Sequence, residues 1–187
     1  MTGEFVVCEL FALNAEHAVG ARYSLLEFAK HGGLTHNNSS GWGLSFQREG
    51  DSNVIKEPQA AFDSPWVTFV AQQHIMSHCM ISHIRRATRG EPSYVNTHPF
   101  KRELGGRGHV FAHNGSLEDH RSRLPLRSKR FRPIGQTDSE HAFCYLLESL
   151  ASKWDRVTPT VHDRLAVVAE TAAKLRELGN ANFLYFD

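Results

Sequence analysis

A short basic motif contains side chains suited to binding a carboxylate. SHIRRATRG (82–90) leaves an apolar segment and brings Arg85, Arg86 and Arg89 together at the start of a loop. A planar guanidinium at a strand end can hold a carboxylate through two parallel hydrogen bonds. Thr88 could donate a further hydrogen bond. Most exposed arginines are only solvated, however, so the motif taken alone favours an ordinary surface loop.

A second motif could stabilise an oxyanion. AHNGSL (112–117) places Asn114 and Gly115 directly after an apolar segment. Asn-Gly is a common hairpin turn, and a plain turn is the more frequent use of this dipeptide. A side-chain amide beside a glycine N–H nevertheless supplies two converging donors, which is the composition of an oxyanion hole for acyl transfer.

Two further motifs contribute an acidic residue and a histidine as candidate site residues. In TDSE (137–140), Asp138 falls in the first turn of a predicted helix, where its interaction with the helix dipole is a sufficient explanation. Alternatively, it could face a cleft and bind an ammonium group. In NTHPF (96–100), His98 precedes a proline, and no neighbour in sequence would orient its imidazole. We interpret His98 as part of a site wall rather than as a base.

The three cysteines have to be judged singly. Cys8, Cys79 and Cys144 are an odd number without CxxC spacing, so they indicate neither a disulfide framework nor a zinc ribbon. Cys8 lies in FVVCELFAL (5–13), and a free cysteine in such a segment is more often a small buried hydrophobe than a nucleophile. Its position alone does not identify it as reactive.

The elements that must position these side chains can be read from hydrophobic periodicity. The strand at 5–13 is expected to be buried on both faces, and 109–115 is expected to run into a turn. Further strands are predicted at 41–47, 78–84 and 182–187. Helices are predicted at 24–33, after Ser64 and Pro65, after a capping box of Thr137 with Glu140, and at 161–179. Strands followed by two consecutive helices and a last strand favour an α+β fold over regular βαβ alternation.

Composition limits the class of protein. The 187 residues correspond to about one domain, and 21 basic against 20 acidic residues give a net charge of +1. This balance gives no general reason to expect nucleic acid or a membrane surface as partner. The sequence has no apolar stretch of membrane-spanning length and no basic leader, so we expect a cytoplasmic protein. It also lacks a glycine-rich phosphate loop, and no cofactor is expected.

Taken together and in order, the motifs resemble one family. The chain resembles the class II glutamine amidotransferases, specifically the bacterial stand-alone single-domain type, from Cys8 to its last residue. The resemblance rests on the cysteine of the first strand, GWG (41–43), HIRRATRG, NTHPF, AHNGSL and FRPIGQTDSEHAF (131–143). It implies the four-layer αββα sandwich of the N-terminal nucleophile hydrolases.

The resemblance also implies a role for each candidate residue. Cys8 would attack the side-chain amide of glutamine or of a γ-glutamyl compound, forming a thioester and releasing ammonia. Asn114 and Gly115 would form the oxyanion hole. Arg85 with Thr88 would bind the substrate α-carboxylate, and Asp138 would bind its α-ammonium. His98 would form part of the site wall. A separate synthetase could accept the ammonia, and a homo-oligomer is compatible with the sequence.

The sequence departs from the family in two places. The family's nucleophile is the first residue of the mature chain, whereas seven residues precede Cys8 here. We therefore expect residues 1–7 to be a removable extension and 8–187 to be the amidotransferase domain. The family's domain continues with further strands, so we also expect a missing C-terminal part. Both departures affect catalysis rather than folding. A second possible function is therefore that of an inactive family member that serves as a binding or regulatory subunit.

Two other readings are weaker. His74, His78, Cys79 and His83 could suggest a metal site, but neighbouring strand residues point to opposite faces, so three ligands do not converge locally. The segment 121–132 has six basic residues and no acid, which could suit nucleic acid or an acidic partner. Because Phe131 is its only aromatic residue, a solvated loop is favoured.

Overall fold

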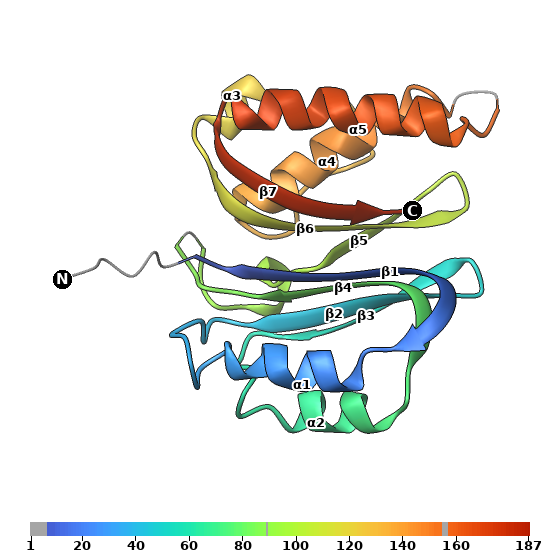
Figure 1. Cartoon of the computed structure of the whole chain (residues 1–187). Helices are drawn as coiled ribbons and strands as arrows, with labels where there is room; N and C mark the ends of the chain where they lie inside the picture. The colour runs from blue at the N-terminus through green and yellow to red at the C-terminus, as the bar shows by residue number, and fades with distance from the viewer. Residues whose placement is uncertain (1–6, 89, 155–156) are drawn as a thin grey trace.

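The computed structural model describes residues 7–88, 90–154 and 157–187, and it has four layers. Figure 1 shows a layer of helices, then two stacked sheets, then a second layer of helices. The first sheet has the strand order β1-β4-β2-β3, and the second has the order β5-β6-β7. All pairings within these sheets are antiparallel. The α+β class predicted from the order of elements is confirmed.

The elements have the following bounds. The strands are β1 (Glu9–Gly20), β2 (Trp42–Arg48), β3 (Asp51–Glu57), β4 (Met76–Ile84), β5 (Phe100–Leu104), β6 (Arg107–Leu117) and β7 (Gly179–Phe186). The helices are α1 (Arg22–Lys30), α2 (Pro65–Gln72), α3 (His120–Arg123), α4 (Asp138–Ala151) and α5 (Val161–Arg176), and a 3-10 turn, η1, spans Tyr94–Asn96. The polar strand β3 and the short strand β5 have no predicted counterpart.

Alternation along β1 separates the two faces of the first sheet. Phe11 and Leu13 pack with the α1 and α2 core, whereas Leu10 packs with Val110 of the second sheet. The expectation that this strand is buried on both faces was wrong, because β1 is an edge strand in which residues 9–11 and Leu13 are only partly buried and Ala12 is exposed. Cys8 directly precedes β1 rather than lying inside it.

The second sheet packs its outer face on α4 and α5. Phe111 stacks on Phe143 of α4, with ring centroids 5.4 Å apart, and the leucines of α4 are fully buried. The turn predicted at Asn114 and Gly115 does not form, because β6 continues to Leu117 and pairs with β7 from Val110 to Leu117. The partner strand comes from the end of the chain, so no local pattern could reveal it.

Helix α4 begins as predicted but is capped differently. The Thr137 hydroxyl accepts the Glu140 N–H, as in a capping box. The Glu140 carboxylate, however, accepts the Gly135 N–H and pairs with Arg102 instead of returning to Thr137. The capping box in the structure lies at the start of α5, between Thr160 and Asp163.

The basic segment 121–132 consists of part of α3 and a loop beside α4. The carboxylate of Glu148 accepts the backbone N–H groups of Arg127 and Ser128. An acid from α4 therefore anchors this loop, consistent with the favoured reading of a surface loop.

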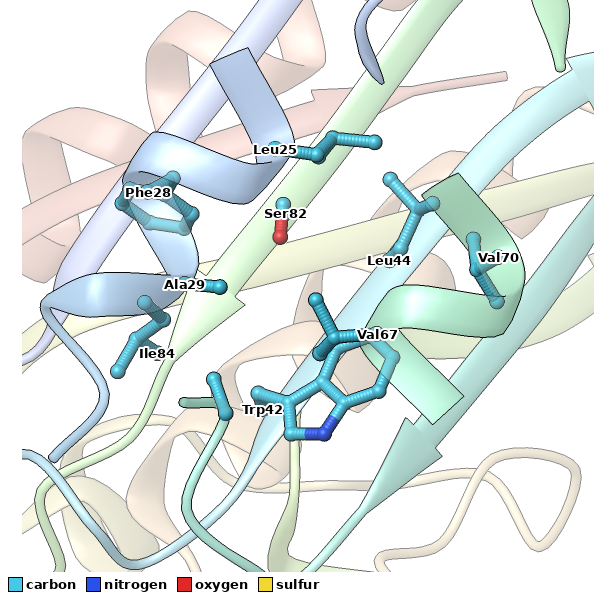
Figure 2. A pocket seen from close by; sticks show the side chains of 10 residues that line it. Leu25, Phe28, Ala29, Trp42, Leu44, Val67, Val70, Ser82 and Ile84 are labelled. Atoms are coloured by element: carbon cyan, nitrogen blue, oxygen red, sulfur yellow. The ribbon is translucent and has the colours of Figure 1, made fainter. Parts of the chain in front are cut away.

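An apolar hollow lies between α1, α2 and the first sheet (Figure 2). Its one hydroxyl, that of Ser82, donates to the carbonyl oxygen of Gly43 at 2.9 Å. The hollow lies on the helix-covered face of the first sheet, opposite the second sheet, and its other polar side-chain group, the Trp42 indole N–H, donates to Glu57 at 2.7 Å. We assign it to core packing. Within the described ranges, no helix is both long enough and apolar enough to cross a bilayer.

Candidate active site

The Cys8 thiol lies against the end of β4. Its Sγ accepts the Arg86 N–H at 3.2 Å and lies 3.3 Å from the Arg86 carbonyl oxygen. The register of β1 on β4, in which Glu9 pairs with Ile84, places the thiol there. The Cys8 carbonyl oxygen accepts the side-chain amide of Asn114 at 2.6 Å. Cys8 is thus held between one strand of each sheet.

Burial raises the pKa of the Cys8 thiol above its ordinary value. The Arg86 N–H and the positive charge of Arg85 act in the opposite direction, while the negative charge of Asp138 raises the pKa further. The net effect leaves the thiol protonated at neutral pH. A reaction that uses the thiolate therefore needs a base at this position.

Arg85 follows the last residue of β4 and is 3% exposed. Its guanidinium donates to the carbonyl oxygens of Gly90 at 3.1 Å and Glu91 at 3.3 Å, which orient its plane. Burial lowers the pKa of Arg85, and the neighbouring Cys8 opposes that shift. The structure therefore brings Arg85 close to the thiol.

The rest of the basic motif is less closely involved. Thr88 is exposed on the loop after β4, and Arg89 lies outside the described residues. The Arg86 side chain turns away and donates to the Asn37 carbonyl oxygen at 3.3 Å. Of the arginines predicted for carboxylate binding, Arg85 is therefore the buried one among the described residues.

Asp138 occupies the first turn of α4 and is 6% exposed. One carboxylate oxygen accepts the Leu117 N–H at 2.7 Å, and the other accepts the Ser139 N–H at 2.9 Å. The side chain thereby joins α4 to the end of β6, and its charge acts on Cys8. Asp138 therefore lies at the helix start, as predicted, and close enough to Cys8 for its charge to act on the thiol.

Asn114 and Gly115 lie within β6 and face β7 across the sheet register. A Cβ atom at Gly115 would lie 1.7 Å from the Asn180 carbonyl oxygen, so only glycine permits this approach of the two strands. Asn114 is partly buried and contacts Cys8 directly. The structure therefore brings the predicted amide and the predicted nucleophile together.

His98 is 3% exposed, and the positive charge of Arg85 acts on it. Its ring centroid lies 4.2 Å from that of His83, with the two rings tilted by 35°, and neither ring has a hydrogen-bond partner in the described part of the chain. Burial lowers the pKa of His83 to about 3 and that of His98 well below its ordinary value. Both imidazoles are neutral at pH 7, which fits a wall better than a base.

Two polar residues of the site were missed from the sequence. His113 Nδ1 lies 2.8 Å from the Ser139 hydroxyl, while its Nε2 donates to the Asn180 carbonyl oxygen at 3.3 Å. The Ser139 hydroxyl also lies 3.4 Å from Asp138. His113 and Ser139 immediately flank Asn114 and Asp138 in the two motifs, which was the available signal. Together they connect the amide strand to the acidic helix start.

Comparisons with known proteins show which family the chain belongs to. The family model for class II glutamine amidotransferases matches residues 7–187. The chain is 38% identical over 181 residues to the Escherichia coli K12 protein YafJ, whose name carries a provisional assignment as a glutamine amidotransferase. That match covers 97% of this chain and 70% of YafJ.

Two solved structures resemble the fold. The crystal structure of a predicted glutamine amidotransferase from Pseudomonas aeruginosa has a TM-score of 0.70 and 31% identity, covering 96% of this chain and 69% of that chain. Glutamine phosphoribosylpyrophosphate amidotransferase from Bacillus subtilis has a TM-score of 0.59 over 96% of this chain and 35% of its own, and at 18% identity it supports the fold alone. The four-layer sandwich is thus that of the N-terminal nucleophile hydrolases, and the chain belongs to the class II glutamine amidotransferases.

Proposed function

We propose that this protein hydrolyses the side-chain amide of glutamine, or of a γ-glutamyl compound, through a thioester on Cys8. The observation that carries the proposal is the arrangement around that thiol. Arg85 from the end of β4, Asn114 from β6 and Asp138 from α4 all act on Cys8, by hydrogen bond or by charge. A cation, an acid and an amide donor around one thiol suit a zwitterionic amino acid with a reactive amide.

The proposed reaction has two halves. The Cys8 sulfur attacks the amide carbon, the C–N bond of the tetrahedral intermediate breaks, and the nitrogen leaves as ammonia after taking a proton. Water then attacks the thioester carbon, the C–S bond breaks, and the acid product leaves while the thiol recovers its proton. With glutamine as substrate, the products are glutamate and ammonia. A separate synthetase is the proposed acceptor of the ammonia.

We assign stabilisation of the oxyanion in each half-reaction to Asn114 and Gly115. An amide NH₂ group carries two N–H donors, so the bond from Asn114 to the Cys8 carbonyl can orient the group while the second N–H meets the oxyanion. The Gly115 N–H would be the second donor. His98, whose ring packs against that of His83, would form part of the site wall without exchanging protons.

Substrate recognition is assigned to Arg85, Thr88 and Asp138. Arg85 would hold the α-carboxylate, because its guanidinium plane is fixed by the Gly90 and Glu91 carbonyl oxygens. Asp138 would hold the α-ammonium, and Thr88 would add a hydrogen bond to the carboxylate. With these assignments, a protein cation faces the substrate carboxylate and a protein anion faces the substrate ammonium.

The base is assigned to the α-amine of Cys8 itself. Within the full chain, the Cys8 nitrogen belongs to a peptide bond and has no basic lone pair, while burial raises the pKa of its thiol. A free α-amine has a pKa of about 8 and would lie on the same residue as the sulfur. We therefore propose that the active form begins at Cys8, after removal of residues 1–7, and that 8–187 is the catalytic domain.

Ammonia release from glutamine tests both points. A shortened chain begun as Met-Cys8, with loss of the initiator verified by intact mass, is compared with the full chain, and Cys8→Ala and Cys79→Ala are made in the shortened chain. We expect turnover in the shortened chain and in Cys79→Ala, and none in the full chain or in Cys8→Ala. Normal turnover by a chain that retains residues 1–7 would refute the α-amine mechanism. Turnover by Cys8→Ala would refute the thioester.

A binding or regulatory role is the second candidate, and the raised pKa of the Cys8 thiol favours it for the full chain. Calorimetry separates it from the enzyme. Glutamine binding by the shortened chain without ammonia release would support the binding subunit, provided that Arg85→Gln abolishes the binding. Turnover in the same preparation would exclude it.

A further inference from the structure

Three side chains distant from one another in sequence meet at the start of β1. The carboxylate of Glu9 lies 2.5 Å from Nδ1 of His31 through one oxygen and 3.5 Å from Nδ1 of His36 through the other. The two imidazole centroids are 4.7 Å apart, and one ligand atom from each residue fits within 4.8 Å of the others. One acid and two imidazoles therefore converge on a single point.

The loop that follows α1 is folded so as to produce this convergence. His31 comes directly after α1, and a bridge between Gly32 and Asn37 closes the loop that carries His36. The buried amide of Asn38 donates to Glu9 at 3.2 Å, which fixes the carboxylate from a second side. The three groups remain partly open to solvent, with side-chain exposures of 26%, 37% and 48% for Glu9, His31 and His36. An ion could therefore enter from solution.

We propose that Glu9, His31 and His36 bind a divalent first-row transition metal ion, with Zn²⁺ as the best fit. Imidazole nitrogen with one carboxylate oxygen is a donor set that Zn²⁺ accepts, whereas Ca²⁺ and Mg²⁺ prefer oxygen ligands alone. The ion would take these three ligands and a water in tetrahedral geometry. This site goes beyond the proposed amide hydrolysis and does not depend on it.

The distances between the ligand atoms show that the Glu9 and His36 half of the proposed zinc site already has the required spacing. Two ligands bound to zinc at about 2.1 Å in tetrahedral geometry lie roughly 3.4 Å apart. The separation of Glu9 from His36, at 3.5 Å, already matches this value. That match makes the Glu9 oxygen facing His36 the ligand, and His31, which contacts the other Glu9 oxygen at 2.5 Å, would exchange this hydrogen bond for a metal bond. The partly exposed side chain of His31 permits that exchange.

The position of the site indicates what the ion would do. Cys8 and Glu9 are consecutive, and their side chains contact different parts of the fold, with the thiol at β4 and the carboxylate at the loop after α1. The same loop accepts a hydrogen bond from Arg86 at Asn37. A bound ion would therefore tie the start of β1 to this loop without contacting the thiol. We expect it to stabilise the fold rather than to react.

Metal binding to the full chain tests the proposal in a Cys8→Ser background, which removes the nearest thiol as a competing ligand. After chelator treatment, calorimetry with Zn²⁺ and thermal unfolding should show one ion bound per chain and a higher Tm, reversed by chelator. His36→Gln and Glu9→Gln should each lower the affinity by roughly 100-fold or more, since loss of supporting residues alone lowers it 10- to 100-fold. His17→Gln and Glu16→Gln, exposed on β1, are the matched controls and should bind as the parent does.

Cobalt substitution provides a readout that does not depend on stability. Co²⁺ should give the visible absorption of a tetrahedral ion without a thiolate charge-transfer band, and His36→Gln should lose this signal. His36 is exposed and near the tip of a loop, so its replacement should leave the fold unchanged. Absence of binding by the parent chain, or unchanged binding in both His36→Gln and Glu9→Gln, would overturn the proposal.

Discussion

The side-chain amide of Asn114 donates a 2.6 Å hydrogen bond to the carbonyl oxygen of Cys8, 106 residues away in sequence. Asn114 lies on the second sheet, and Cys8 leads into the first sheet. This bond therefore joins the two sheets at the proposed site. It also determines where the amide would stand relative to a substrate bound at the thiol.

Asn114→Ala should lower kcat by roughly 10²- to 10³-fold in the chain that begins at Cys8, the usual effect of removing one oxyanion-hole donor. The lost hydrogen bond should reduce the free energy of unfolding by only about 0.5–1.5 kcal/mol. Initial rates of ammonia release and urea unfolding measure the two effects. Asn53→Ala, exposed on β3, is the control. A large loss of stability with normal turnover per folded molecule would show that Asn114 is only structural.

Arg85→Lys and Arg85→Gln should separate two roles of the guanidinium. Lysine keeps the charge but cannot form the planar pair of bonds, so loss of about 1.5–3 kcal/mol should lower kcat/KM by roughly 10- to 150-fold. Arg85→Gln also removes the positive charge that favours the Cys8 thiolate, so the pKa of that thiol should rise. The pH dependence of Cys8 alkylation by iodoacetamide, followed by peptide mass spectrometry, measures this pKa. Its midpoint should shift to higher pH in Arg85→Gln and not in Arg85→Lys. An equal shift in both variants would contradict the charge argument.

Asp138→Asn should move the pKa of the Cys8 thiol in the opposite direction. The negative charge of Asp138 disfavours the thiolate, so removing it should lower the thiol pKa and allow alkylation at lower pH. The KM for glutamine should rise by about tenfold or more, because the α-ammonium would lose its charge-assisted partner. Asp63→Asn, which is exposed, should change neither quantity. A normal KM in Asp138→Asn would remove this residue from substrate binding.

Gly115→Ala should destabilise the second sheet. The added Cβ would lie 1.7 Å from the Asn180 carbonyl oxygen, so β6 and β7 would have to separate locally. We expect the free energy of unfolding to fall by about 3 kcal/mol or more, the upper part of the range for overpacking. Gly106→Ala, with open space around the new Cβ and a φ of +78°, should cost about 1–2 kcal/mol from backbone strain alone. Equal losses of unfolding free energy in the two variants would show that β6 and β7 can adjust to the added Cβ atom.

Local periodicity in the sequence was sufficient for much of the fold. The apolar stripe of α4 and the Ser64 and Thr137 caps depend on residues within one or two helical turns, so they could be predicted and were confirmed. Helix α5 also forms, but it buries Val167, Thr171 and Leu175, whereas Leu165, which the apolar pattern placed on the buried stripe, is 60% exposed. The ordered motifs likewise indicated the family that the comparisons establish. Such features depend on neighbours in sequence, and the sequence displays them directly.

Contacts between distant segments were decided only by the tertiary structure. Asn114 and Gly115 have the composition of a turn, yet they continue β6 because β7 returns from the chain end to pair with it. Glu140 has the spacing of a capping partner, yet it pairs with Arg102 of β5. Glu9, His31 and His36 share no motif and meet through the packing of a loop on a strand. Hydrogen-bond and charge partners depend on distance in space, and a spacing along the chain specifies that distance only within a single element.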